Sequence, residues 1–134
     1  MGFLDYLRES VARKAEGAPE PAVRTAGVES GTNVLGLVKH LTAVERYLFL
    51  GEDVRAWAST FRPKADETVE SVVAAYREVV RQANEVIAAY SDLEATTPRG
   101  STMRWLLVHM VEETARHAGH ADILREQIDG STGR

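Results

Sequence analysis

The residues best suited to chemistry lie in residues 112–126, a stretch near the end of the chain that reads EETARHAGHADILRE. It contains two of the four histidines in the sequence, His117 and His120, together with Glu112 and Glu113. Imidazole and carboxylate groups are common ligands of zinc, nickel and iron. Such a group of residues can bind a metal if the side chains share one face of a helix.

Helical geometry places these side chains on the same side as apolar residues. A step of about 100° per residue brings four polar side chains within about 80° of one another: His109, Glu113, His117 and His120. The apolar residues that point in nearly the same direction are Leu106, Met110, Leu124 and Ile128. Roughly opposite, on the expected solvated face, lie Arg104, Asp122 and Glu126. The polar group therefore lies within the predicted buried stripe.

A second histidine-bearing segment shows the same pattern. His40 shares its side of a predicted helix with three apolar residues, Leu37, Val44 and Leu48. Two helices would thus each direct an imidazole into the core. Burying an ionisable group without a partner is costly, so these side chains must be satisfied by one another or by a metal.

Two interpretations of this group are open from the residues alone. In the first, Glu113 and His117 bind a metal from one face of a helix, since they are four residues apart, and His40 supplies the third ligand. Three protein ligands leave an open coordination position, which is typical of catalytic metal sites. In the second, His40 is a hydrogen-bonded core residue, and Glu113 forms an ion pair with His117 within the helix.

Two familiar metal motifs are absent from the sequence. The His-Glu-x-x-His pattern of zinc proteases does not occur. Di-iron bundles carry Glu-x-x-His on two helices, whereas no histidine here has a glutamate three positions before it. These observations exclude a zincin and a ferritin-like di-iron centre.

Glycine and proline cluster at three breaks, over residues 16–21, 61–66 and 96–101. The segments between them are rich in helix formers and predict four helices, at about residues 3–16, 32–50, 67–93 and 101–129. Ser30 or Thr32 is the expected N-cap of the second helix, and Gly130 is the expected glycine after the fourth. A turn of helix is expected within residues 17–31. The pattern predicts an all-α fold, a four-helix bundle.

Composition narrows the class of protein. At 134 residues, one domain spanning residues 1–134 is expected. The net charge of −4 offers no basic surface for nucleic acid, and no apolar run is long enough for a membrane span. The absence of cysteine excludes disulfides and a cysteine nucleophile. Charged residues in the opening MGFLDYLRESVARK argue against a secretion signal, so a cytoplasmic protein is expected.

Three stretches resemble one known family. They read GFLDYLRESVARKAEG, SGTNVLGLVKHLTAVERYLF and MRWLLVHMVEETARHAGHADILREQIDG. Together they are similar to the DinB-like superfamily, and most closely to its actinobacterial branch, long labelled a domain of unknown function. The resemblance implies a four-helix bundle of up-down-down-up topology that commonly forms homodimers. It also implies a metal triad, with one histidine on the second helix and two ligands four residues apart on the fourth.

Transferred to this chain, the implied metal ligands are His40, Glu113 and His117. Glu113 replaces the histidine that most relatives carry, although isomerase-type relatives resemble this chain there. His120 stands where many relatives have glutamine; as a fourth ligand, a substitute for Glu113 or a proton carrier, it is the candidate catalytic residue. His109 is expected to be a core residue or to support the ligands. The implied metal is divalent, with zinc as the first choice and nickel or iron as alternatives.

Characterised relatives include S-transferases that use mycothiol or bacillithiol and a mycothiol-dependent isomerase. Because this chain lacks cysteine, it would have to take its thiol from a small molecule. The resemblance therefore implies a metal-dependent thiol S-transferase that conjugates mycothiol to small electrophiles in detoxification, with pocket walls expected from Tyr47, Trp105 or Arg116. Two alternatives are a metal-dependent hydrolase, whose open position holds water, and a non-catalytic metal-binding dimer.

Overall fold

The computed structural model describes residues 2–132. Four α-helices lie in this range: α1 (Gly2–Ala15), α2 (Val34–Phe49), α3 (Val69–Ala88) and α4 (Met103–Asp129). Two short 3₁₀ helices lie between them, η1 (Ala22–Arg24), where a turn of helix was predicted, and η2 (Trp57–Phe61). The described residues contain no β-strand, so the prediction of an all-α fold with four helices is confirmed.

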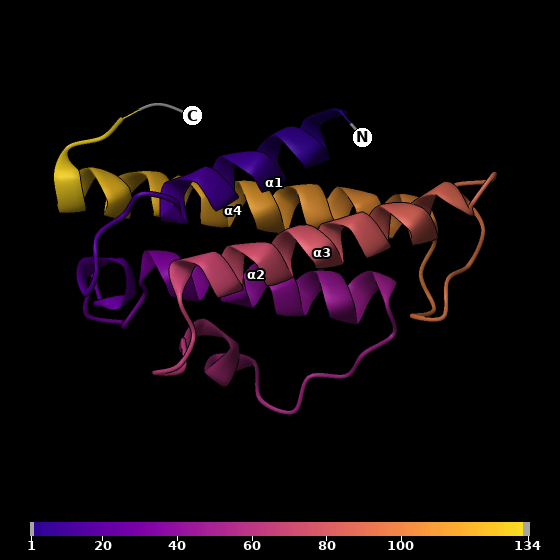
Figure 1. Ribbon diagram of the computed structural model, residues 1–134. Coiled ribbons are helices and arrows are strands. Elements are labelled where there is room, and N and C mark those ends of the chain that lie inside the picture. The colour runs from indigo at the N-terminus through magenta and orange to yellow at the C-terminus, as the bar shows by residue number, and fades with distance from the viewer. Residues whose placement is uncertain (1, 133–134) are drawn as a thin grey trace.

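The helices pack mainly in two pairs, with α1 against α4 and α2 against α3 (Figure 1). In Figure 1, α1 and α4 run from right to left, whereas α2 and α3 run from left to right. The connection between α2 and α3, residues 50–68, therefore returns along the bundle, and it carries η2 back against α2. Because α2 also contacts α4, the two histidine-bearing helices lie together.

One continuous core joins the four helices. Its buried members come from every helix, among them Val11, Leu41, Tyr76 and Met110. Full burial of an apolar side chain contributes roughly 1.5–3 kcal/mol relative to leaving it exposed. The core is therefore the main source of stability, and its packing fixes the positions of the four helices relative to one another.

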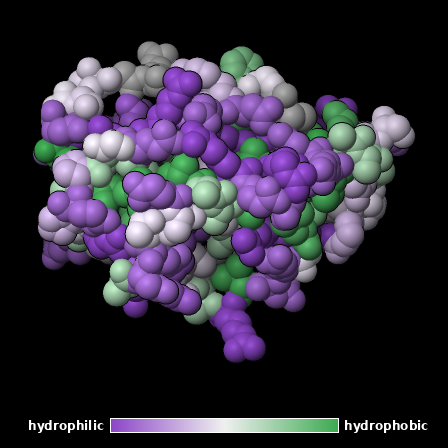
Figure 2. Space-filling view, in the orientation of Figure 1, coloured by the Kyte–Doolittle hydropathy of each residue, from purple (hydrophilic) through white to green (hydrophobic). Residues whose placement is uncertain are grey.

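The surface is mostly polar. Hydrophilic side chains cover most of the face seen in Figure 2, and apolar atoms show in patches between them. The large apolar side chains that are nevertheless exposed are Phe3, Tyr6, Val28, Trp57, Trp105, Val108 and Ile123. None of the helices in the described range is long and apolar enough to cross a membrane.

The ends of α2 and α4 test the predicted capping residues. Asn33, and not Ser30 or Thr32, caps α2, because its side-chain oxygen accepts a hydrogen bond from the Gly36 amide at 2.7 Å. The hydroxyl groups of Ser30 and Thr32 lie 3.2 Å apart and bond to each other instead. Gly130 ends α4 in the left-handed conformation, with φ of 74°, as predicted.

The end of α3 differs from the prediction. The helix ends at Ala88, before the predicted Leu93. The Arg104 amide donates to the Leu93 carbonyl oxygen at 2.8 Å, and the Met103 amide donates to that of Ala95 at 3.1 Å. These bonds satisfy the backbone after α3 without continuing the helix. The longer helix was a wrong prediction, because residues 93–95 bond to the first residues of α4 instead of continuing α3.

One side chain predicted on the solvated face of α4 lies instead at a helix interface. Asp122 pairs with the buried Lys14 of α1, with 3.3 Å between Oδ1 and Nζ. The pattern of α4 alone gives no information on where α1 packs, which explains the error. Arg104 and Glu126 are exposed, as predicted.

A buried ion pair links three helices. Arg8 on α1 donates from Nε and Nη2 to the two carboxylate oxygens of Glu45 on α2, at 2.7 and 2.8 Å. Its Nη1 atom donates to Asn84 on α3 at 2.7 Å and to Asp5 at 2.8 Å. A buried guanidinium is tolerated when it is paired with a carboxylate and its other N–H groups find acceptors, and these four bonds meet that need. The network therefore ties α1 and α3 to α2, the helix that carries His40.

Candidate metal centre

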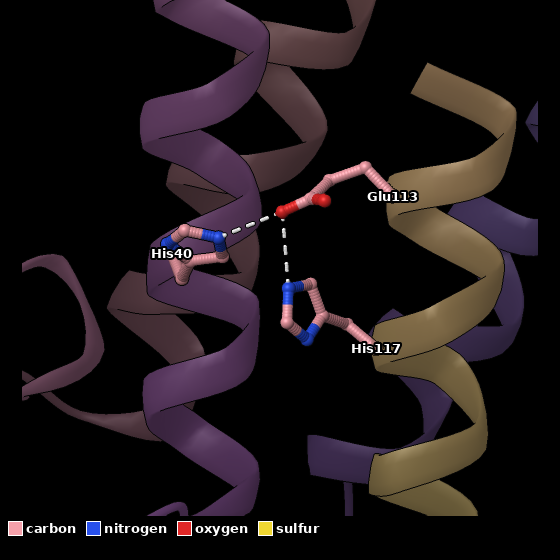
Figure 3. A group of neighbouring side chains, drawn as sticks. All are labelled: His40, Glu113 and His117. Atoms are coloured by element: carbon pink, nitrogen blue, oxygen red, sulfur yellow. Dashed lines mark hydrogen bonds and ion pairs between the residues drawn. The ribbon is translucent and has the colours of Figure 1, made fainter. Parts of the chain in front are cut away.

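Three of the predicted site residues meet between α2 and α4 (Figure 3). The Oε1 atom of Glu113 lies 3.1 Å from Nε2 of His40 and 3.1 Å from Nε2 of His117. One ligand atom from each residue lies within 4.8 Å of the other two. His40 and His117 are buried and Glu113 is half-buried. The fold therefore assembles a possible metal-binding triad from two helices that are distant in the sequence.

The donor set suits a divalent metal. Two imidazoles and one carboxylate ligate zinc in several enzymes and also bind non-haem iron. Glu113 and His117 are one helical turn apart on α4, so their ligand atoms share a face of the helix. Three protein ligands leave coordination positions for a substrate, as in catalytic sites.

The orientation of His40 is set by residues of η2. Its Nδ1 atom lies 2.8 Å from the Thr60 hydroxyl, which itself donates to the Trp57 carbonyl oxygen at 2.6 Å. Because the single proton of that hydroxyl is used, Thr60 accepts a hydrogen bond from Nδ1–H of His40. The Phe61 ring stacks on the imidazole with 3.8 Å between centroids. The neutral tautomer that results carries a lone pair on Nε2, as a metal-ligating histidine requires.

Burial controls the charges of the triad. It lowers the pKa of His40 and of His117 below the ordinary histidine value, although Glu113 opposes the shift in both. Burial also raises the pKa of Glu113. The hydrogen bond with His40 and the attraction of His117 in its protonated form outweigh this effect, so the pKa of Glu113 stays below its usual value. At neutral pH the site then holds two neutral imidazoles and one carboxylate.

In this charge state, the contact between His40 Nε2 and the Glu113 carboxylate has no proton to form a hydrogen bond. His40 has used its only N–H on Thr60, so its Nε2 lone pair faces the Glu113 carboxylate, which is also an acceptor, at 3.1 Å. Two acceptors at that distance repel each other unless a cation lies between them. A divalent metal bound by both atoms would remove the repulsion. The residues present therefore fit a metal.

His120 lies next to the triad but is not one of its three residues. Its Nδ1 atom is 3.3 Å from Nδ1 of His117, so one ring donates a hydrogen bond to the other. The His120 side chain is exposed, although the helical pattern predicted it within the buried stripe. The stripe is centred near Met110 and Ala121, and His120 lies about a quarter turn from that centre at about 100° per residue.

Two other predicted side chains lie outside the triad. His109 stacks on Trp105 with 4.9 Å between ring centroids, and its side chain is 38 % exposed, so it is not a core residue. Arg116 forms an exposed ion pair with Glu112 at 2.9 Å. Both residues are therefore at the surface of α4, beside the triad rather than in it.

A cavity of about 240 Å³ opens beside the triad. Its lining consists of His40, Val44, Tyr47, Leu48, Trp57, His109 and Glu113. Of the three predicted wall residues, Tyr47 lines this cavity, whereas Trp105 and Arg116 do not. A larger cavity of about 430 Å³ lies between η1 and the end of α4, but no titratable side chain of the described residues lines it. The smaller cavity is therefore the better candidate for a reactive site.

Several residues around the site were not predicted. Thr60, Trp57 and Phe61 lie in a connection between helices, where no periodicity marks the residues that will pack. The two aromatic residues of this connection, Trp57 and Phe61, were the sequence feature that could have indicated packing against the site. Arg99 lies over the Tyr47 ring, 3.7 Å from its centroid, and donates to the Tyr47 carbonyl oxygen at 2.7 Å. This contact joins the connection before α4 to the last turn of α2, and it has no local signature in the sequence.

The comparison with known families covers almost the whole chain. Residues 1–130 match the family model described as mycothiol-S-transferase. No curated protein and no solved structure matched the chain. The family match confirms the resemblance seen in the sequence. The chain therefore belongs to the mycothiol-S-transferase family.

Proposed function

We propose that this protein is a metal-dependent S-transferase that conjugates mycothiol to small electrophiles in detoxification, in the cytoplasm. The observation that carries the proposal is the convergence of Glu113 Oε1 with Nε2 of both His40 and His117. The family match supports a transferase role with this thiol. We propose zinc as the bound metal, with nickel or iron as alternatives, because all three accept imidazole and carboxylate ligands.

The proposed roles follow from the positions of the side chains. His40, Glu113 and His117 would hold the metal, whose charge would lower the pKa of a thiol bound beside them. The thiolate sulfur forms a bond to the electrophilic carbon, and the leaving group departs with the electron pair of the bond that breaks. His120 is the proposed carrier of the thiol proton, since its ring lies against His117 and is exposed to solvent.

Thiol ionisation alone gives a modest acceleration. A thiol of pKa about 8.5 is roughly 3 % thiolate at pH 7, and a pKa of about 6.5 would raise that fraction about 25-fold. The lower basicity takes back roughly 6- to 10-fold, for a Brønsted slope of about 0.4–0.5. Most of the acceleration would therefore come from holding the thiolate and the electrophile in line. The residues that line the cavity should therefore affect the rate as much as the metal ligands do.

We also propose the finer features of the family fold. The helix directions in Figure 1 support an up-down-down-up topology, and the shared core supports one domain over residues 1–134. A homodimer is supported by the exposed face of α4, which carries Trp105, Val108 and Ile123. The small exposed residues Ala115 and Gly119 lie between them and would allow close approach of a second helix.

The direct test mixes the purified protein with mycothiol and the fluorogenic electrophile monochlorobimane, with and without a chelator and after metal is restored. We expect turnover when both metal and mycothiol are present, and none when either is missing. For metal content, His109→Ala is the matched control for His40→Ala, because it removes a histidine of the same cavity that is not a member of the triad. Thiol-independent hydrolysis of esters or amides would favour a hydrolase instead. Metal binding with neither activity would favour a non-catalytic role.

A further inference from the structure

The cavity beside the triad has a lining that restricts what can reach it. His40 and Glu113 contribute one part of the lining, and the rest of it, apart from His109, consists of apolar or aromatic side chains: Val44, Leu48, Tyr47 and Trp57. Val44 and Leu48 belong to the buried core of α2. A molecule that approaches the triad through this cavity therefore passes between mostly apolar walls.

The same cavity offers no cationic side chain to an anionic electrophile. Among the described residues that line it, none is lysine or arginine. The Arg99 guanidinium contacts the Tyr47 ring, but it donates to the Asp53 carboxylate and to backbone oxygens of Tyr47 and Glu52. If a divalent cation and a thiolate were bound, the negative charges of the thiolate and of Glu113 would balance the cation. The site would then have no net positive charge with which to attract a carboxylate or a phosphate.

The aromatic walls favour a flat partner. The rings of Tyr47 and Trp57 pack edge to face with 5.3 Å between centroids, and Trp57 also meets the His40 ring at 6.0 Å. Aromatic groups gain energy from such contacts beyond the burial of area. The volume of about 240 Å³ is below the range of about 300 Å³ or more typical of drug-sized ligands. The cavity therefore suits one substituted ring.

We propose that this cavity binds the electrophile, and that the electrophile is a neutral, planar aromatic compound of about one ring. The inference rests on the proposed S-transferase function, to which it adds the substrate class and the residues Tyr47 and Trp57 that select it. An anionic compound of the same shape binds poorly because of its charge. A small non-aromatic electrophile gains nothing from the walls.

A suitable probe of this class is 1-chloro-2,4-dinitrobenzene. The mycothiol sulfur forms a C–S bond at the chlorine-bearing ring carbon, and the C–Cl bond breaks as chloride leaves with its electron pair. The thiol proton passes to solvent, so the reaction needs no oxidant or reductant. The anionic counterpart is 4-chloro-3,5-dinitrobenzoate, which has the same leaving group, both nitro groups ortho to the chlorine and a carboxylate at the para position. Because the two chlorides differ in intrinsic reactivity, the activity with each is divided by its uncatalysed rate with mycothiol.

Binding is measured without turnover by tryptophan fluorescence. The chain has two tryptophans, so Trp105→Phe leaves Trp57 as a reporter in the cavity wall, and Trp57→Phe leaves Trp105 as a reporter outside it. Neutral 1,3-dinitrobenzene, which lacks a leaving group, should quench Trp57 saturably and Trp105 only by weak collisions. Anionic 3,5-dinitrobenzoate should quench neither saturably. This measurement requires no thiol, so it is independent of the proposed transferase activity.

Turnover provides the second measurement. Trp57→Ala should raise the KM for 1-chloro-2,4-dinitrobenzene about 5-fold, the loss expected for one aromatic contact. It should leave the KM for iodoacetamide, a small non-aromatic electrophile, unchanged. Trp105→Phe is the matched control and should change neither value. Elemental analysis should find the same metal content in both variants, which shows that η2 still holds His40.

The outcomes separate this inference from the proposed function. Equal quenching of Trp57 and Trp105, or equal activity toward the neutral and the anionic chloride, would overturn the substrate class even in an active transferase. Saturable quenching of Trp57 in a protein without transferase activity would support the aromatic-binding cavity and overturn the proposed function instead.

Discussion

The Glu113 carboxylate faces the Nε2 lone pair of His40, whose only N–H is donated to Thr60, and this contact between two acceptors is the physical reason to expect a metal. His40→Ala removes the ligand of α2 and should abolish metal binding while the helical circular-dichroism signal stays intact. His109→Ala should keep the metal, because His109 is outside the triad. Elemental analysis measures the metal content of both variants. A full complement of metal in His40→Ala, or none in His109→Ala, would show that the ligands are misassigned.

Thr60 should control metal affinity through His40. Thr60→Val keeps the shape of the side chain but removes the acceptor for Nδ1–H of His40, so the affinity should fall roughly 10- to 100-fold. Thr60→Ser keeps the hydroxyl and should bind almost as tightly as the unmodified protein. Competition with a chromophoric chelator measures both affinities, and nitrogen NMR of the metal-free protein reports the His40 tautomer. Equal affinities would mean that packing on Phe61 alone holds the ring.

The rotation of α4 about its axis explains which of its histidines joins the site. The buried stripe of α4 is centred near Met110 and Ala121. At about 100° per residue, His117 lies about 30° from that centre and Glu113 lies about 70° from it. His120 and His109 lie about 90° or more away. His117 and Glu113 therefore face α2, whereas the other two histidines reach the surface.

The attachment of α1 to its neighbours depends on the Arg8–Glu45 pair. Arg8→Met leaves a buried carboxylate without its partner and should lower the free energy of unfolding by about 3–5 kcal/mol. The double variant Arg8→Met/Glu45→Leu removes both charges and should recover much of that loss. Urea unfolding followed by circular dichroism compares the variants. If the single and double variants are equally destabilised, the unpaired charge is not the cause.

The exposed face of α4 that carries Trp105, Val108 and Ile123 bears on the assembly of the whole molecule. We expect a homodimer in solution, and Ala115→Arg should dissociate it by placing a long charged side chain where a small residue would allow close approach. Ala74→Arg, on the exposed side of α3, is the matched control and should leave the dimer intact. Light scattering at micromolar concentration measures the mass. The mass of one 14.8 kDa chain for the unmodified protein would contradict the dimer.

The stability of the whole molecule should depend on pH through the buried imidazoles. Burial lowers the pKa of His40 and of His117, whereas the unfolded chain takes up protons at about pH 6.5. Each histidine therefore contributes stability that is present above about pH 6.5 and lost as the pH falls toward its folded pKa. Between pH 7.5 and 5.5, urea unfolding of the metal-free protein should show a loss of at most about 1.4 kcal/mol per histidine. His40→Gln should show a smaller loss; an equal one would contradict this origin.

The sequence by itself determined the helices and the spacing of two ligands. Helical periodicity, the breaks at glycine and proline, and the Gly130 cap are local properties, and the structure confirms them. Glu113 and His117 are one turn apart, so a helix through them presents both on one face whatever surrounds it. The apolar stripe around His40 indicated that its ring points inward, and the ring is indeed buried.

Only the tertiary structure decided which side chains complete the site. Thr60 and Trp57 reach His40 because residues 50–68 fold back along α2. The pairing of Asp122 with Lys14 likewise depends on segments far apart in the chain, and the early end of α3 depends on bonds from the first residues of α4. Such contacts draw their free energy from burial and hydrogen bonds between distant segments. No pattern within one segment encodes them, so they emerge when the helices pack.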